Sequence, residues 1–523
     1  MSVPSFTRDD ASAGRGPSRR KPAASWLGLR PGTLLALVAI AVLLVPLSAL
    51  SQPSDSSSKG GKLAQLRQQY GLSQANLGEV DPTSEAMRLA TLGLKNVAVT
   101  LLWDRANHYK KVEDWTNLSA VLEQMTKLQP NFYSVWDFQA HNLSYNISVE
   151  FDDYHDRYAW VMKGIEFLRQ GISYNLREPR LLGRMGWFIG QKIGKADEKT
   201  QYRRLFKADD DFHDRDRAGR TLPERDNWLV GREKYVAGQQ LVDSGAPLKT
   251  TALIFHSEPM MTAINHAKAL EEDGTFGAAA RDAWKLAGDE MRRFSVREIP
   301  TSWDVPIRLG MREAEMARME RLAAELEALM PGRYKALEET KRAALTPEQK
   351  AALDVPPLER TDAQHAAART ATDALAVDWA QVVRDAPVDV RIKAKEILRQ
   401  HTEARETSEI IDRYRDIVNF NVWRATCEAE VTEAALKARE SMWKAEQEFQ
   451  NARLQTAKQA FEESFTAWSE VLEASPVLRN DQITRDDLNE VIDRYRKLLE
   501  QLDEPFPKDF PLQGILKAPP AGS

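Results

Sequence analysis

The segment IIDRYRDIVNFNVWRATCEAEV, residues 410–431, decides the fold class of this chain. Its apolar side chains recur at steps of three and four residues: Ile410, Tyr414, Ile417, Phe420, Trp423, Cys427 and Val431. An α-helix turns by about 100° per residue, so this spacing places them on one face. No glycine or proline occurs between Val388 and Ser475. The pattern therefore predicts one long amphipathic helix.

The same helical pattern covers most of the 523 residues. No run alternates apolar and polar residues between turn residues, as a half-buried strand does. In RLGMREAEMARMERLAAELEALM, residues 308–330, methionines and leucines stand at helical spacing, which is more typical of a core than of a docking surface. We therefore expect an all-α fold with long amphipathic helices.

Several helix starts are visible in the sequence. Thr346 precedes Pro347 and Gln349, which is the order of an N-cap, a first-turn proline and a capping-box partner. Two further starts are predicted at Ser257, ahead of EPMMTAINHAKALEEDG, and at Thr484, ahead of RDDLNEVIDRYRKLLEQL.

Three segments interrupt the helical pattern. Residues 207–226, KADDDFHDRDRAGRTLPERD, are highly charged, and we expect a solvated surface loop there. Residues 331–360 contain four prolines, which predicts a hinge. The tail of residues 503–523 is rich in proline, which is typical of extended chain.

Residues 31–50, PGTLLALVAIAVLLVPLSAL, carry no charge and match the roughly 20 residues that cross a bilayer core. We expect a transmembrane helix that acts as a signal anchor. The basic tail of residues 1–30 places the N-terminus in the cytoplasm and the bulk of the chain on the periplasmic side. Residues 51–80, which begin SQPSDSSSKGG, are expected to be a flexible linker.

A cleaved signal peptide is the alternative for this segment. Ala49 and Ser51 are small residues at the spacing of a cleavage site. The long region before the apolar run, and the length of the run itself, favour the uncleaved anchor.

The composition argues against several function classes. The formal net charge is −5, so no excess of positive charge indicates a nucleic-acid partner. Cys427 is the single cysteine, which rules out an intramolecular disulfide. The sequence contains no nucleophile elbow, Walker motif or dinucleotide-binding motif. We expect neither enzyme activity nor a cofactor.

A weak repeat of ~34 residues runs through the helical pattern. Large and small residues recur in order: Trp103, Ala106 and Tyr109, then Trp136 and Ala140 after Pro130, and later Ala445, Ala457 and Phe461. In these positions the chain resembles tetratricopeptide-repeat proteins, over about residues 84–200 and 415–475.

The stretches LWDRANHYKK, WDFQAHNLSYNISVEFDD, LIFHSEP and LDEPFPKDFP are together similar to a group of membrane-anchored, repeat-containing bacterial proteins without a known activity. The resemblance implies a solenoid of helical hairpins with an inner groove for peptides or partner helices. It implies a repeat region over 81–305, a helical connecting region with the proline-rich hinge over 306–386, and a C-terminal region of long, repeat-like helices over 387–502.

The segment WDFQAHNLSYNIS, residues 136–148, is the candidate binding site. Placed on a helix, its residues divide into three groups. The buried seam of the repeat is expected at Trp136, Ala140, Leu143 and Ile147. The roughly opposite side, which lines the groove in a repeat helix, carries Asp137, His141 and Tyr145. On a flank, able to bond a neighbouring loop or a partner, lie Asn142 and Asn146.

A metal site is the competing interpretation of the same region. The necessary ligand types are present at His141, Asp152, Asp153, His155 and Asp156. They lack the spacing of a metalloprotease or EF-hand motif, so we expect packing or groove lining and no metal.

These observations lead to one leading hypothesis and two alternatives. The hypothesis is a membrane-anchored, tetratricopeptide-like scaffold that binds other proteins at the cell envelope and contacts the lipid bilayer through residues 31–50. The alternatives are a metal-dependent envelope enzyme with a helical fold and a purely structural spacer.

Overall fold

The computed structural model describes residues 95–303 and 305–516, together with positions 38–40, 42, 43, 46, 61, 62 and 65. Over these residues the chain is helical, and the all-α prediction is confirmed. Within the same residues β-pairing is limited to one isolated antiparallel bridge, between Ile299 and Ile307.

The chain forms two compact units, Met1–Gly78 and Glu79–Ser523. Apart from a few positions, the basic tail of residues 1–30, the predicted anchor of residues 31–50 and the linker of residues 51–80 lie outside the described residues. Among the residues that are described, no helix is long and apolar enough to cross a membrane.

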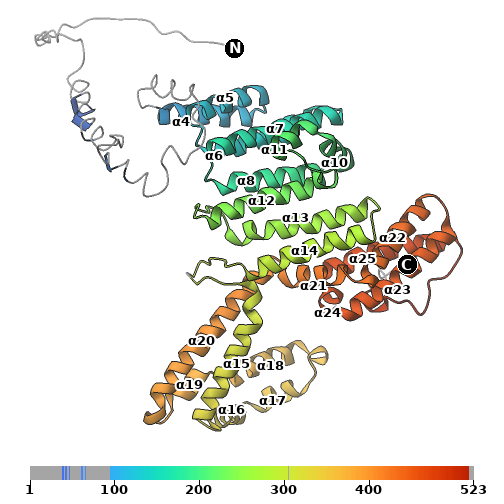
Figure 1. Cartoon of the computed structure of the whole chain (residues 1–523). Coiled ribbons are helices and arrows are strands. Elements are labelled where there is room, and N and C mark those ends of the chain that lie inside the picture. Colours follow the sequence, from blue (N-terminus) through green and yellow to red (C-terminus); the bar gives the residue numbers. More distant parts are fainter. Residues whose placement is uncertain are drawn as a thin grey trace, which may run out of the picture. The chain divides into compact units, whose positions relative to one another are not determined.

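In the first half of the second unit, the longer helices lie side by side in the order of the chain (Figure 1). Helix α4 packs on α5, α6 on α7, α8 on α12, α12 on α13, and α13 on α14. Their bounds are α4 Lys95–Lys111, α5 Trp115–Leu128, α6 Tyr133–His141, α7 Tyr154–Tyr174, α8 Pro179–Trp187, α12 Asn227–Asp243, α13 Ala252–Glu272 and α14 Ala278–Val296. Shorter elements join them: η2 Asn142–Ile147, η3 Ser148–Glu150, η4 Phe188–Lys192, α9 Ile193–Lys195, α10 Lys199–Ala208, α11 Asp210–Arg217 and η5 Pro223–Arg225.

Two glycines allow α7 to lie very close to α6 and η2. A Cβ atom at Gly171 would stand 2.7 Å from Cγ of Trp136, and one at Gly164 would stand 2.1 Å from Oγ of Ser144. The Trp136 side chain is held in this contact by its Nε1, which donates a 2.7 Å hydrogen bond to the carbonyl oxygen of Pro130. The seam between the two helices therefore requires residues without a side chain on α7.

The second half of this unit holds the longer helices. Helix α15 packs along α20, α17 on α18, α22 on α23, and α21 on α14. The bounds are η6 Leu309–Met311, α15 Arg312–Leu329, α16 Arg333–Ala343, α17 Pro347–Asp354, η7 Pro357–Glu359, α18 Asp362–Leu375, α19 Trp379–Arg384, α20 Val388–Ile417, α21 Phe420–Glu430, α22 Glu433–Gln450, α23 Leu454–Ala474, α24 Pro476–Asn480, α25 Gln482–Gln501 and η8 Gln513–Ile515.

The prediction of one continuous helix through residues 410–431 is wrong. Helix α20 ends at Ile417, and Asn419 takes a left-handed conformation with φ 49° before α21 begins at Phe420. Asparagine tolerates this conformation better than most residues with a side chain. The break leaves Ile417 62% exposed but buries Phe420, whose ring lies 6.3 Å from that of Phe294 in α14.

The prediction of a solvated surface loop over residues 207–226 is wrong about the loop, but it is correct about the exposure of several charged side chains, among them Asp210, Arg215 and Arg217. Most of its acidic run forms α11, and the Arg220 side chain that follows is fully buried. The Nη2 atom of Arg220 lies 2.7 Å from Oδ2 of Asp216 and 2.5 Å from Oε2 of Glu233. Opposite charges within this segment and on α12 neutralise one another, so Asp216 and Arg220 of the charged run belong to the packed structure.

The helix starts are partly as predicted. The capping box at Thr346 and Gln349 is confirmed, with both of its hydrogen bonds present. Ser257 is not an N-cap, because α13 begins five residues earlier at Ala252 and continues through Pro259. The N-cap of α25 is Asp481, whose carboxylate accepts a 2.8 Å hydrogen bond from the amide of Thr484.

The proline-rich tail is non-helical for most of its described length, but it packs against the helices before it. Phe510, Leu512 and Ile515 are buried in the core formed by α22, α23 and α25. The Phe510 ring lies 5.1 Å from the ring of Phe465. Apolar side chains between the prolines therefore fix the tail in place.

Candidate functional site

The four predicted seam residues, Trp136, Ala140, Leu143 and Ile147, are all buried. The Trp136 ring stacks against α7, with its centroid 4.6 Å from that of Phe167 and 5.7 Å from that of Tyr174. Trp136 and Ala140 belong to the core cluster that α6 shares with α7.

On the other side of the same segment, His141 and Tyr145 form a stack of aromatic rings with the next helix pair. Their ring centroids are 4.6 Å apart and nearly parallel. The Tyr145 ring continues onto Trp187 at 5.6 Å and meets the edge of Phe188 at 5.7 Å. His141 is exposed, and Tyr145 and Trp187 are half-buried, so the stack is accessible from solvent.

Charged side chains surround this stack. Nε of Arg184 lies 2.5 Å from Oδ1 of Asp137. The ammonium of Lys192 lies 4.4 Å from the centre of the Tyr145 ring, and that of Lys110 lies 5.0 Å from the centre of the Phe138 ring. We call this surface the His141 face, and it consists of Lys110, Asp137, His141, Tyr145, Arg184, Trp187 and Lys192.

Two of the three helices that form this face, α6 and α8, continue directly into a π-helical turn. One turn, η2, holds Tyr145, and the other, η4, runs from Phe188 to Lys192. A π-turn rotates the following side chains relative to a regular α-helix, and such turns are frequent at functional sites. Here they bring Tyr145, Phe188 and Lys192 into one cluster. The apolar spacing of the sequence did not predict these two π-helical turns.

The electrostatics of the face favour a neutral imidazole. The neighbouring rings partly remove the His141 imidazole from water, which lowers its pKa; the cations Arg184, Lys110 and Lys192 lower it further, and Asp137 opposes them. Burial also raises the pKa of Tyr145 to about 12 and lowers the pKa of Lys192. At neutral pH the face therefore carries more positive than negative charge.

The two asparagines predicted on the flank bond within the protein. Asn142 is 1% exposed, and its Nδ2 donates to Oγ of Ser119 in α5 at 3.3 Å and to Oε1 of Gln139 at 3.4 Å. Asn146 donates from Nδ2 to Oδ1 of Asn142 at 3.1 Å. In the structure this pair links η2 to α5 and α6 and is not part of the His141 face.

The residues of the metal hypothesis do not come together. His155 pairs with Asp153 through Nδ1 and Oδ1 at 3.0 Å, and Asp153 is the N-cap of α7. His141 instead stacks on Tyr145. In the parts of the chain that the structure describes, no group of three histidine, cysteine, aspartate or glutamate side chains is placed to hold a metal ion.

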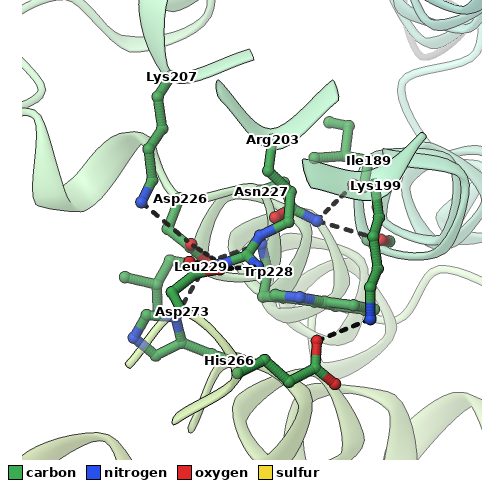
Figure 2. Close-up of polar contacts among 12 residues, drawn as sticks. Ile189, Lys199, Arg203, Lys207, Asp226, Asn227, Trp228, Leu229, His266 and Asp273 are labelled. Atoms are coloured by element: carbon green, nitrogen blue, oxygen red, sulfur yellow. Dashed lines mark hydrogen bonds and ion pairs between the residues drawn. The ribbon is translucent and has the colours of Figure 1, made fainter. Parts of the chain in front are cut away.

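A second polar cluster, which the sequence did not indicate as a site, is centred on Asp226. Figure 2 shows the side chains of Arg203, Lys207 and His266 directed toward its carboxylate. Oδ1 of Asp226 lies 3.0 Å from Nδ1 of His266, and Oδ2 lies 3.9 Å from Arg203 and 3.8 Å from Lys207. Arg203 also forms a two-point ion pair with Asp273, at 3.1 and 2.8 Å.

The Asp226 cluster stabilises the contact between helices, as a structural ion-pair network does. Asp226 is the N-cap of α12 and accepts a 3.0 Å hydrogen bond from the amide of Trp228. Burial raises its pKa, but the hydrogen bond and charge of His266, with Lys207 and Arg203, outweigh burial and leave it below its ordinary value. The ionised carboxylate thus ties α10, α12 and α13 together. The sequence signal for the cap was an aspartate directly before a helical run.

Comparison with known protein families, with curated proteins and with solved structures finds no match for this chain. The functional interpretation therefore depends on the geometry of the chain itself.

Proposed function

We propose that this chain is a membrane-anchored, tetratricopeptide-like scaffold that binds a partner protein on the His141 face at the cell envelope. The observation that carries the proposal is the solvent-accessible stack of His141, Tyr145 and Trp187, which continues from one helix pair to the next. Exposed clusters of aromatic and cationic side chains are typical of protein interfaces.

The arrangement of the helices supports the same proposal. Lys110 and Trp103 of α4 contact Phe138 of α6, and Tyr145 of η2 contacts Phe188 of η4. The first helices of successive pairs thus meet along one surface, as they do along the groove of a helical-repeat solenoid. The uncharged run of residues 31–50 supports a bilayer anchor that would hold this surface at the membrane.

Photo-crosslinking in native membranes tests the binding role. Benzoylphenylalanine introduced at position 141 is expected to crosslink a second protein. The same probe at position 163, on α7 and away from the face, serves as the matched control. If positions 141 and 163 give identical products, or if Asp137→Ala and Tyr145→Ala leave every product from position 141 unchanged, the proposed binding face is wrong.

The anchor is tested separately by protease accessibility. A tag placed after residue 523 is expected to be cleaved by protease added to spheroplasts. Protection of the tag in intact spheroplasts would contradict the proposed orientation.

A further inference from the structure

The ammonium group of Lys192 is half-buried on the His141 face and has no anionic partner there. Among residues 95–303 and 305–516, no carboxylate lies within ion-pair distance of it, and its ammonium lies 4.4 Å from the centre of the Tyr145 ring. The carboxylates of Glu198 and Asp197 act on it only from beyond that distance. Burial already lowers the pKa of this lysine. A cation that is partly removed from water without a direct ion pair is costly to the free protein and gains from an anion supplied by a partner.

Lys110 repeats this arrangement on the other side of His141. It is exposed, lies over the Phe138 ring, and likewise has no ion-pair partner within the described part of the chain. Lys110 belongs to α4, whose Trp103 contacts Phe138 of α6, and Lys192 belongs to η4, whose Phe188 contacts Tyr145 of η2. In Figure 1, α4 and α8 lie on opposite sides of α6. The third cation, Arg184, is the one that Asp137 neutralises.

We infer, on the basis of the proposed function, that the partner presents an acidic protein segment with at least two carboxylate side chains, one for Lys192 and one for Lys110. Apolar side chains between the two carboxylates would cover the stacked rings of His141, Tyr145 and Trp187. Lys110 lies over the Phe138 ring and Lys192 over the Tyr145 ring, so we assign one carboxylate of the partner to each.

The charge pattern distinguishes this partner from other polyanions. Nucleic acids and anionic lipid surfaces are bound by dense rows of cations. The His141 face instead has two separate lysines with aromatic rings between them, and the whole chain has a formal net charge of −5. A segment with spaced carboxylates and intervening apolar groups matches this pattern.

Zero-length crosslinking with a carbodiimide tests the inference on the full chain in its native membrane. The reagent joins a lysine amine to a carboxylate that it already touches, and mass spectrometry identifies both residues. We expect Lys192 and Lys110 to be linked to aspartate or glutamate side chains of a second protein. Links from these lysines only to carboxylates of this chain, to a terminal carboxylate or to a lipid headgroup would overturn the inference.

Charge variants give a second readout through the photo-crosslink from position 141. Lys192→Glu is expected to lower the yield of the partner product about fivefold to tenfold at low salt, because like charges then face each other. Lys192→Arg should keep the photo-crosslink while removing the carbodiimide link. Lys163→Glu is the matched control, since Lys163 also lies over an aromatic ring, that of Trp160 at 3.8 Å, but on α7.

The two proposals fail in different ways. A photo-crosslinked partner that is insensitive to Lys192→Glu and forms no carbodiimide link would leave the scaffold standing and refute the acidic segment. Loss of both kinds of product from this face would refute both.

Discussion

The indole Nε1 of Trp284 in α14 donates a 2.7 Å hydrogen bond to Oε1 of Glu271 in the last turn of α13. Nε of Arg439 in α22 lies 3.9 Å from the other oxygen of this carboxylate, and its Nη2 lies 2.6 Å from Oε1 of Glu430 in α21. Burial raises the pKa of Glu271 to about 7. Two carboxylates therefore share one guanidinium where α13 and α14 meet α21 and α22.

Glu271→Gln is expected to change the dependence of stability on pH. The pKa of Glu271 rises from an ordinary 4.5 to about 7 in the fold, so its stabilising effect is fully present below pH 4.5 and is lost as the pH rises through 7. Between about pH 5 and pH 8 the free energy of unfolding of the wild type should fall by about 1–3 kcal/mol, and that of the variant should not show this fall. Urea unfolding followed by tryptophan fluorescence at both pH values measures the difference.

The neighbouring Glu272→Gln serves as the control for that experiment. Glu272 is exposed and pairs with Lys199 at 2.8 Å, so its removal should leave the pH dependence of the wild type intact. Equal pH dependence in the wild type and in Glu271→Gln would show that the carboxyl does not titrate in this range.

Gly171→Ala is expected to destabilise the contact between α6 and α7. The added Cβ would lie 2.7 to 2.9 Å from three atoms of Trp136, a buried side chain that has no room to move. Overpacking of this kind costs about 1–3 kcal/mol in the free energy of unfolding.

Gly288→Ala, in α14, provides the matched control for Gly171→Ala. There the new methyl group would meet only the end of the Arg292 side chain, at 3.5 Å. Because alanine is a better helix former than glycine, the free energy of unfolding of this variant should rise by about 0.5–1 kcal/mol. Chemical denaturation should show that the free energy of unfolding falls in Gly171→Ala and rises in Gly288→Ala. If Gly288→Ala were destabilised as much as Gly171→Ala, a clash with Trp136 would not explain the effect at position 171.

Asp226 has two roles, as the N-cap of α12 and as a negative charge among cationic side chains, and Asp226→Asn separates them. Asparagine still caps α12, but it removes the negative charge that faces Arg203, Lys207 and His266. Loss of the charge that faces the buried His266 and Arg203 is expected to lower the free energy of unfolding by about 2–4 kcal/mol, even though Arg203 keeps its ion pair with Asp273.

Asp481→Asn is the comparison for this variant. Asp481 caps α25 in the same way, and within the described residues no cation lies at ion-pair distance from it. Its replacement should change stability by less than about 0.5 kcal/mol, since asparagine and aspartate are similar N-caps. Equal losses in the two variants would show that capping, and not charge, explains the effect at Asp226.

Asn419→Val tests the break between α20 and α21. A β-branched residue is strained at φ 49°, so we expect a loss of about 1–2 kcal/mol in the free energy of unfolding. Asn419→Gly should be tolerated, because glycine adopts this conformation without strain. Asn421→Val, at an exposed position inside α21, is the control, and a loss there as large as at position 419 would contradict the conformational explanation.

The sequence alone allowed the elements that depend on local spacing to be predicted. The all-helical class followed from apolar side chains three and four residues apart, and the start of α17 followed from the order of Thr346, Pro347 and Gln349. On the candidate segment, helical geometry placed Asp137, His141 and Tyr145 apart from Trp136 and Ala140. These features need only the neighbouring residues in the chain, because helical hydrogen bonds and caps are local.

Tertiary structure alone decided the features that depend on distant residues. The left-handed turn at Asn419 accompanies the burial of Phe420 against Phe294, and the carboxylate of Asp226 gathers charges from α10 and α13. The cations that approach His141 come from α4 and α8 as well as η4, through helix pairs and π-turns that apolar spacing does not reveal. Such contacts form only when helices pack, since their energies come from burial and charge pairing between segments far apart in the chain.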